Sequence, residues 1–435
     1  MPLKNKSKWR EGRAAYAMIL PAVLIIAAVA LWPLLRSFWI SMFDLRLNDP
    51  TRNAIHYSYS VNIEQYADRF PGLLRAVKRE AGNAGGGAPS ALSAVQSKLE
   101  EVSQGLEEDP AFRKRLGKVN ELLDAFSPIP QELRFIPVDN AKAERLKAEL
   151  QEIRKELAGL KAGGSLDRPD EVIGLTSALL DTFQAPNFVG LSHYKELMSG
   201  GRLWESLSNT LLFTVFAVAL EMLFGLLIAL LLNRSFRGRG LVRAAVLIPW
   251  ATPTAVSAMI WHYLYDGQNG IVAKLLYEAG LISDMGTLLS SGSRVMGSVI
   301  MADVWKTAPF VALLLLAGLQ NIPSSLYEAA WVDGGGRWKQ FVHVTVPLLK
   351  PAFFVALMFR TLDAFRVFDL IYVLTGGGPA NSTESVSIYA YKTMFSELDF
   401  GKGSALSVIV FVCVLLISMA YVKWLGSDVV GRRAG

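Results

Sequence analysis

Long runs of apolar residues constrain the fold of this chain more than any other feature. A helix that crosses the hydrocarbon core of a membrane needs about 20 mainly apolar residues. Runs of this kind lie at residues 14–41, 206–232, 241–265, 295–319, 348–374 and 404–425. Hydrophobic residues make up 52% of the chain and charged residues 19%, which is typical of a membrane protein. We therefore expect an all-α polytopic membrane protein with about six transmembrane helices.

Three prolines interrupt the middle runs. Pro249 and Pro253 lie in the third run, and Pro309 lies in the fourth. A proline is tolerated in a spanning helix where neighbouring groups satisfy the backbone that it leaves unpaired. These helices are therefore expected to pack in a protein bundle rather than to face lipid on all sides.

Basic residues predict the orientation, because short cytoplasmic loops are enriched in lysine and arginine. They occur at the start of the chain, after the second run, after the fourth run and at the end. The members are Lys4, Lys6, Lys8, Arg10 and Arg13; Arg234, Arg237, Arg239 and Arg243; Arg337, Lys339 and Lys350; and Arg432 and Arg433. Both termini are then cytoplasmic. The alternative is a cleaved signal peptide ending at Ala28–Ala30, although the apolar run continues past that site.

This topology divides the chain into four parts. Residues 1–43 form the cytoplasmic N-terminus and first span, 44–203 an extracytoplasmic loop, 204–426 a core of five spans, and 427–435 a cytoplasmic tail. Within the loop, glycine-rich residues 81–87 predict a joint, and helical periodicity at 90–125 and 140–161 predicts an antiparallel hairpin. Its mixed charge is consistent with a solvated spacer or with a docking surface for a partner.

The chain lacks the usual signatures of catalysis and metal binding. Its one cysteine, Cys413, excludes an internal disulfide, and its four histidines match no metal-ligand spacing. Residues 401–404, Gly-Lys-Gly-Ser, lack the spacing of a phosphate-binding loop. We expect no enzyme activity, no cofactor and no metal in this chain, and we expect no nucleic-acid partner. Any ATPase that drives it is then a separate protein.

Residues 325–351 stand out between two apolar runs. Ser325 and Glu328 have the spacing of a capping box, so a helix is predicted to begin there. Asp333 and the glycines at 334–336 predict a turn, and a second short helix follows before Pro347. Such a helix pair either docks in a groove of another protein through Tyr327, Trp331 and Phe341 or is an ordinary interfacial loop. The residues of this stretch are consistent with both roles.

Charged residues inside the fifth run are candidates for a transport pathway, because ionisable groups in spans usually face a bundle interior or a wet cavity. Arg360, Asp363, Arg366 and Asp369 recur every third residue and would pair along one helix. We expect a structural role for Arg360 and a pathway role for Asp363 and Asp369. The aromatic candidates for stacking on sugar faces are Phe365, Phe368 and Tyr372, and the weaker charged candidates are Glu221 and Asp303. Residues 376–379, Gly-Gly-Gly-Pro, are expected to form an outer turn.

Several stretches together resemble a known family. Glu328-Ala329-Ala330, Asp333-Gly334, Phe341, Val344 and Pro347 resemble the signature loop of the permease subunits of binding-protein-dependent ABC importers. Further stretches resemble the sugar branch, of the maltose, trehalose and glycerol-3-phosphate type. They are Phe188–Leu191 with Tyr194, Asn209–Leu211, Ala229–Asn233, Trp305–Phe310 and Leu374–Pro379. The resemblance covers residues 10–48 and 187–430 but not most of 50–186, and Gly335 stands where the signature usually has alanine.

The resemblance implies a type I ABC importer permease of a bacterial cytoplasmic membrane. It places a coupling loop at 321–350, whose helix at 325–341 would sit in a cleft of an ATPase dimer that binds ATP and Mg. The further implied partners are a second permease, an extracytoplasmic sugar-binding protein and membrane lipid. The residues expected to couple to the ATPase are Ser325, Glu328, Ala329, Ala330, Asp333, Gly334, Phe341 and Pro347. The residues expected along the substrate pathway are Asp363, Phe365, Arg366, Asp369, Tyr372 and Gly377.

Two other classes of protein compete with this interpretation. An ion- or proton-coupled secondary transporter would use the intramembrane charges, but the sequence contains no internal repeat of broken spans. A membrane scaffold built around the helical hairpin would leave the ordered charges of the fifth run unused. We therefore expect a permease that translocates a sugar, in the class of a di- or oligosaccharide. The particular sugar, the identity of the second permease and the role of residues 50–186 do not follow from the sequence.

Overall fold

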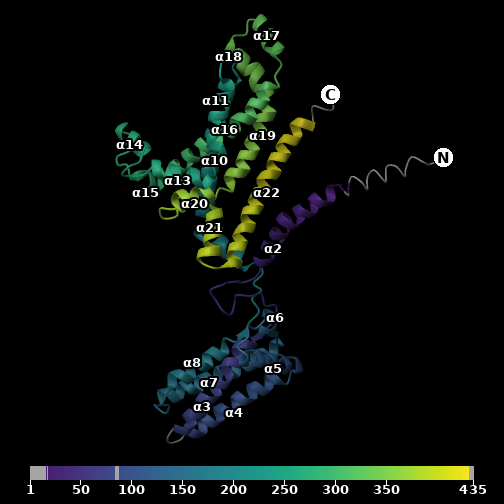
Figure 1. The fold of residues 1–435 in the computed structure, drawn as a ribbon, viewed down its shortest axis with the longest axis vertical. Coiled ribbons are helices and arrows are strands. Elements are labelled where there is room, and N and C mark those ends of the chain that lie inside the picture. The colour runs from purple at the N-terminus through teal and green to yellow at the C-terminus, as the bar shows by residue number, and fades with distance from the viewer. Residues whose placement is uncertain (1–15, 17, 84–87, 431–435) are drawn as a thin grey trace, which may run out of the picture. The chain divides into compact units, whose positions relative to one another are not determined.

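The computed structural model describes residues 16, 18–83 and 88–430. The chain forms two compact units, which are drawn in one ribbon in Figure 1. The membrane unit comprises the chain up to Ser41, Leu191–Glu397 and the chain from Lys402 onward, and the inserted unit comprises Met42–Gly190 and Leu398–Gly401. The basic residues predicted to orient the two termini, at 4–13 and 432–433, lie outside the described residues, as do residues 84–87 of the predicted glycine-rich joint.

Among the described residues, five helices are long and apolar enough to span a membrane. They are Met18–Ile40, Gly201–Asn233, Gly292–Gln320, Arg337–Phe365 and Phe400–Lys423. A sixth candidate is the pair Arg239–Ala251 and Thr254–Leu264, which is bent by 90° at its break. The expectation of an all-α protein with about six spans is confirmed.

The elements of the membrane unit follow, where η marks a π-helical turn. They are η1 (Ala27–Leu31), α2 (Trp32–Ile40), α9 (Ser192–Ser199), α10 (Gly201–Asn233), α11 (Arg239–Val246), α12 (Ile248–Ala251), α13 (Thr254–Leu264), α14 (Ile271–Glu278), α15 (Thr287–Ser290), α16 (Gly292–Gln320), α17 (Ser324–Val332), α18 (Arg337–Gln340), η2 (Phe341–Thr345), α19 (Val346–Phe365), α20 (Asp369–Thr375), α21 (Val386–Tyr391), η3 (Lys392–Ser396) and α22 (Phe400–Val430).

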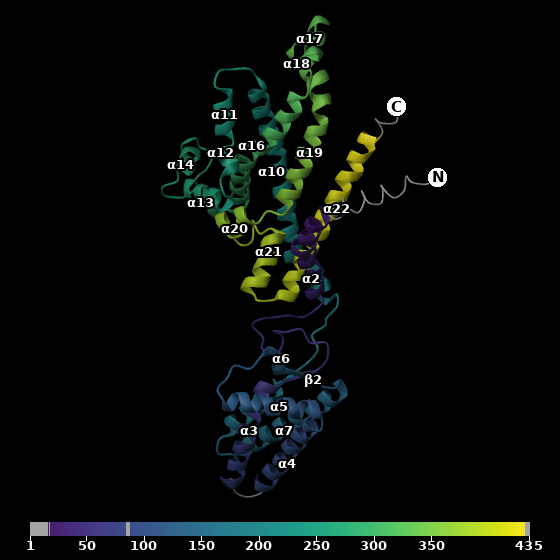
Figure 2. The same ribbon diagram turned by 45° about the vertical axis from the view of Figure 1, so that its right-hand side comes forward.

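The core of the membrane unit lies where α10, α16 and α19 pack side by side (Figures 1 and 2). Phe213 of α10, Val311 of α16 and Ala356 of α19 belong to one buried apolar cluster. Gly225 of α10 allows a close approach, because a Cβ atom there would lie 2.5 Å from a side-chain carbon of Val311. Small residues let helix backbones approach in this way in membranes, where packing drives association.

Two of the predicted spans differ from the structure. The third is not one straight helix, because α12 ends at Ala251 and α13 begins at Thr254, after Pro253; Pro309, by contrast, lies inside α16 without ending it. The fifth was predicted at 348–374, but its apolar helix runs from Arg337 to Phe365. Residues 369–375 form the separate short helix α20, so the predicted run joined two helices.

The inserted unit combines helices with a small sheet. Its elements are β1 (Ser60–Asn62), α3 (Ile63–Asn83), α4 (Ala88–Glu107), α5 (Pro110–Asp124), α6 (Gln131–Arg134), β2 (Phe135–Pro137), α7 (Asn140–Ala162), α8 (Pro169–Leu180) and β3 (Phe183–Gln184). The strands pair antiparallel in the order β2-β1-β3, with Val61 opposite Ile136 on one side and Phe183 on the other. The unit has its own apolar core, which includes Leu99 and Leu150.

The predicted hairpin of two helices is too simple. The segment 90–125 is two helices, because Asp109 accepts a hydrogen bond from the Ala111 amide and Pro110 starts α5, a favourable helix start. The helices α3 and α8 pack on α4 and α7 as well. Within the described residues the unit therefore has six helices and a sheet, and its helix α3 was not predicted because charges and Pro71 obscure its apolar face.

Backbone hydrogen bonds tie together the two ends of the inserted unit. The Asp44 amide donates to the Asn187 carbonyl at 2.8 Å, and the Val189 amide donates to the Met42 carbonyl at 2.8 Å. The two ends of the inserted unit therefore lie next to each other. Residues 398–401 join the same base, where the Leu47 amide donates to the Leu398 carbonyl at 3.0 Å.

Candidate functional site

A buried charge network links three helices of the membrane unit. Arg360 of α19 donates to both carboxylate oxygens of Glu221 in α10, at 2.5 and 2.8 Å. It also donates to Asp303 of α16 at 3.2 Å and to Asp363 of α19 at 2.6 Å. The side chains of Arg360 and Glu221 are 4% and 0% exposed, so neither charge is solvated.

This network fixes the positions of α10, α16 and α19 relative to one another. Separating a buried pair leaves an uncompensated charge, which is far more costly than breaking a pair in water. The expected structural role of Arg360 is consistent with these contacts. Glu221 and Asp303 were rated as weak candidates, yet they supply the partners of Arg360. Their proximity could not be read from the sequence, because the three residues lie on different helices.

The predicted ladder of four charges is only partly present. Asp363 contacts Arg360, and its other oxygen lies 3.8 Å from Arg366. Asp369 begins α20 rather than continuing α19, and it makes no ion pair within the described residues. The prediction failed at this point because the helix ends at Phe365. Asp369 is instead left exposed.

A cavity of about 420 Å³ belongs to the inserted unit, and a smaller one of about 190 Å³ lies beside the charge network. Asp303, Arg360, Asp363, Arg366 and Asp369 line the smaller cavity together with Phe368. Carboxylate and guanidinium groups hydrogen-bond to hydroxyl groups and to charged groups alike. The structure thus brings together three of the predicted pathway residues, Asp363, Arg366 and Asp369, at one wall.

A row of aromatic rings continues from this cavity. Phe368 stacks on Tyr372 with ring centroids 5.2 Å apart, and Tyr391 lies 5.0 Å from each of them. Phe395 follows at 4.9 Å from Tyr391. Phe365, which was predicted to stack on a ligand, is 3% exposed and belongs to the core, so that prediction is wrong. Tyr391 and Phe395 were missed because they lie outside the apolar runs.

Lys306 explains how the broken span is tolerated. Its ammonium group donates to the Thr252 carbonyl at 2.6 Å and approaches the Trp250 carbonyl at 3.4 Å. These carbonyls lie at the break between α12 and α13, where no helical partner is available. A lysine from α16 thus satisfies the backbone freed by Pro253, as the membrane environment requires.

The glycine-rich outer turn is anchored by a buried carboxylate. Glu384, whose side chain is 0% exposed, accepts from Arg202 at 2.9 and 3.1 Å and from Lys392 at 3.0 Å. Burial raises the pKa of Glu384, but the hydrogen bonds from Arg202 and Lys392 outweigh it, and the pKa lies below its ordinary value. The Thr383 hydroxyl donates to the Gly378 carbonyl at 2.8 Å. Gly377 is buried inside this turn rather than open to the cavity.

The predicted coupling loop, residues 321–350, contains α17, α18, η2 and the start of α19, and α17 and α18 lie at one end of the membrane unit, as Figures 1 and 2 both show. It is held by internal contacts: the Tyr327 hydroxyl lies 3.0 Å from the Thr345 hydroxyl, and the Gln340 amide donates to the Gly335 carbonyl at 3.0 Å. The Tyr327 side chain therefore helps to hold the loop in one conformation. The Phe341 ring, half-buried, packs 5.7 Å from the Trp338 ring.

The predicted capping box is not formed. Helix α17 begins one residue earlier, at Ser324, with Pro323 at the N-cap and no side-chain capping bond. Proline has already fixed the entry to the helix, so the Ser325 hydroxyl is not used there. Glu328 remains exposed. It belongs to the surface of the loop.

Gly335 stands where the signature loop usually has alanine, and the structure gives a reason for the glycine in this chain. A Cβ atom at Gly335 would lie 2.5 Å from the Ala330 carbonyl oxygen, so alanine would require the turn to shift. The loop also exposes large apolar side chains: Trp331 is 76% exposed and Trp338 is 75% exposed. Large apolar side chains exposed in this way make the loop a candidate interaction site.

These features define a class of protein. Several apolar spans, charged residues around a membrane cavity and an exposed rigid loop are the parts of a polytopic transport protein. The chain belongs to the family described as the binding-protein-dependent transport system inner membrane component, whose model matches residues 221–429. It is a multi-pass membrane permease component rather than an enzyme. Membership decides against the alternative of an ion- or proton-coupled secondary transporter.

Individual relatives agree with this family. The chain is 46% identical over 238 residues to the trehalose/maltose transport system permease protein MalF of Thermococcus litoralis, covering 54% of this chain and 79% of the relative. It is 43% identical over 245 residues to the trehalose transport system permease protein SugA of Mycobacterium tuberculosis, covering 56% of this chain and 77% of the relative.

The fold has a counterpart among solved structures. A bacterial ABC transporter involved in the import of the acidic polysaccharide alginate matches with a TM-score of 0.50 and 24% identity, over 57% of this chain and 84% of that chain. The expected permease fold is confirmed. The family model begins at residue 221, and so it leaves residues 42–190 unmatched.

Proposed function

We propose that this permease translocates a saccharide, in the class of a di- or oligosaccharide. The observation that carries the proposal is the cavity lined by Asp363, Arg366 and Asp369, from which the aromatic row of Phe368, Tyr372, Tyr391 and Phe395 continues. Charged groups would bind sugar hydroxyls, and aromatic faces would stack on the apolar faces of sugar rings. The names of the trehalose and maltose relatives support this substrate class.

The energy would come from a separate ATPase. Most of the residues expected to contact it lie on the α17–α18 loop, where Glu328, Trp331 and Trp338 are exposed, while Phe341 and Pro347 follow in η2 and α19. A rigid loop seated in an ATPase dimer would transmit closure of that dimer to α16 and α19, which the charge network holds together. ATP and Mg would be bound by the ATPase, and this chain would carry no cofactor.

The remaining partners follow from the same proposal. The chain would pair with a second homologous permease and receive its substrate from an extracytoplasmic sugar-binding protein. Both termini and the α17–α18 loop would be cytoplasmic in a bacterial membrane, and the inserted unit would face the other side. Its helical surface would assist in holding the binding protein. A variant lacking residues 50–186 should then bind that protein more weakly.

The first experiment tests the coupling to an ATPase. The full chain is purified from its native membrane and assayed for a bound ATPase and for ATP hydrolysis, beside a Glu328→Arg, Trp331→Ala variant. The variant should lose the ATPase, whereas Leu281→Arg, at a side chain 69% exposed elsewhere, should keep it. If the wild-type chain brings down no ATPase, the proposed energy source is wrong.

The second experiment tests the substrate. The complete transporter is reconstituted in liposomes, and ATP-driven uptake of labelled trehalose and maltose is measured. Asp369→Asn and Tyr391→Ala should each lower uptake at least ten-fold while retaining the ATPase, because Asp369 is exposed, Tyr391 is half-buried, and neither makes an ion pair within the described residues. Glu278→Gln, an exposed side chain paired only with Lys274, serves as the control. Unchanged uptake in both pathway variants would contradict the proposed pathway.

A further inference from the structure

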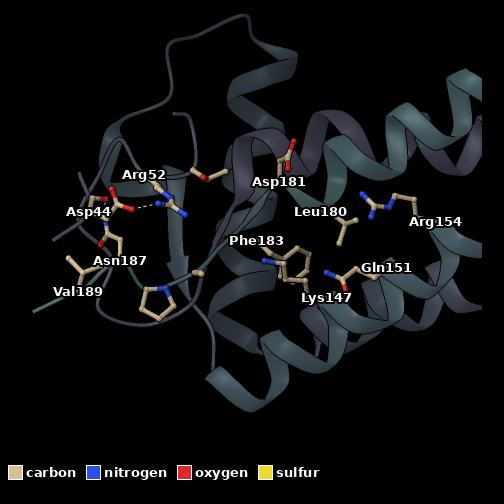
Figure 3. A pocket seen from close by; sticks show the side chains of 13 residues that line it. Asp44, Arg52, Lys147, Gln151, Arg154, Leu180, Asp181, Phe183, Asn187 and Val189 are labelled. Carbon is tan, nitrogen blue, oxygen red and sulfur yellow. Dashed lines mark hydrogen bonds and ion pairs between the residues drawn. The ribbon is translucent and has the colours of Figure 1, made fainter. Parts of the chain in front are cut away.

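The inserted unit contains a cavity of its own, separate from the membrane pathway. Its volume is about 420 Å³, within the range of about 300–1,000 Å³ that small-molecule sites occupy. Figure 3 shows Lys147, Gln151 and Arg154 of α7 on one side and Asp44, Arg52 and Asn187 on the other. Nothing in the permease family match covers this segment.

Some of the lining side chains are already committed to the fold. Asp44 pairs with Arg52, and the Asn187 amide donates to the carbonyls of Asp44 and Ala54 at 3.1 and 2.8 Å. Arg52 keeps further N–H groups free, because a guanidinium has five and this pair does not use all of them. These residues form a rigid wall.

Other lining side chains have no partner. Lys147, Gln151 and Arg154 follow one another at helical spacing on α7, and none makes a side-chain hydrogen bond or an ion pair within the described residues. The same holds for Asp181 at the end of α8. The cavity therefore presents two free cations, one free carboxylate and one free amide.

The local charge is opposite to that of the unit. Acidic residues outnumber basic ones in residues 42–190, and some lysines of the helices are paired, as Lys98 is with Glu156 at 2.5 Å and Lys161 with Asp170 at 2.7 Å. In the cavity the Asp44–Arg52 pair is neutral. The free groups Lys147, Arg154 and Asp181 then leave one net positive charge.

We propose that this cavity is a binding site for a small carboxylate-bearing solute, in the chemical class of a sugar acid. Lys147 and Arg154 would bind the carboxylate, because charge-assisted hydrogen bonds are the strongest that such a site can make. Gln151 and Asp181 would bind hydroxyl groups. Pro186, which lines the cavity and is exposed, offers an apolar surface for the C–H face of a ring.

The test uses the full chain in nanodiscs of neutral lipid at low ionic strength. Binding of glucuronate, glucose and acetate is measured by isothermal titration calorimetry. Glucuronate should bind at least ten-fold more tightly than glucose, which lacks the carboxylate, and more tightly than acetate, which lacks the hydroxyl groups. No preference for glucuronate over glucose would overturn the proposal, and equal binding of acetate would overturn the sugar-acid class.

Variants show whether the binding occurs in this cavity. Lys147→Gln with Arg154→Gln should abolish the preference for glucuronate. The matched control, Lys114→Gln with Lys118→Gln, removes the same charge from exposed positions on α5 and should retain it. Retained preference in the first variant, or equal loss in the control, would overturn the assignment.

Discussion

Replacing Arg360 by leucine should destabilise the membrane unit strongly. The substitution strands Glu221, which is 0% exposed, and Asp303, which is 10% exposed. Removing one partner of a buried pair typically costs about 3–5 kcal/mol, because the other charge is left without compensation. The loss should appear in SDS-induced unfolding of the full chain in mixed micelles, followed by tryptophan fluorescence.

A second substitution and a surface control sharpen this prediction. Leucine at both Arg360 and Glu221 should recover part of the loss, because the stranded charge is then removed. Arg366→Leu should cost no more than about 1 kcal/mol, since Arg366 and Asp363 are 59% and 64% exposed and 3.8 Å apart. If Arg360→Leu costs no more than Arg366→Leu, the network does not hold the helices together.

Three further outcomes are expected. Gly225→Val should destabilise the membrane unit by about 1–3 kcal/mol in the same unfolding assay, because its side chain would overlap Val311; an unchanged midpoint would contradict the close packing. Hydrogen bonds from Arg202 lower the pKa of Glu384 against the effect of burial, so the ionised carboxylate stabilises the outer turn at any pH above its ordinary pKa. This stabilisation should vanish as pH falls through the lowered pKa. Amide hydrogen exchange should show the loss in the wild type and not in Glu384→Gln. Burial lowers the pKa of His56, so the inserted unit should lose stability as pH falls below about 6.5, and thermal melting of His56→Gln should depend less on pH there.

The sequence is most informative where the signal is local. Apolar runs identified the spans, because length and hydropathy are properties of a continuous segment. The prolines marked the break after α12, although not its 90° bend. The signature around Glu328 located the loop, whereas the start of its helix depended on Pro323 rather than on Ser325.

The sequence is least informative about contacts between distant residues. Arg360 and Glu221 are 139 positions apart, and no spacing rule connects them. Phe365 was expected to stack on a sugar but is buried, because periodicity within an apolar span does not identify which face is buried. Tyr391 reaches the aromatic row only because the chain turns back after α20.

The closed base of the inserted unit has a thermodynamic consequence. The Asp44 amide bonds to the Asn187 carbonyl and the Val189 amide to the Met42 carbonyl, so the two ends of the insertion are held together. For the rest of the protein, the insertion is therefore equivalent to one short loop. Closing a longer loop adds little entropy cost, only about 0.6 kcal/mol for each doubling of length. The insertion can therefore change in length or unfold as a separate cooperative unit, while the membrane unit keeps its own stability.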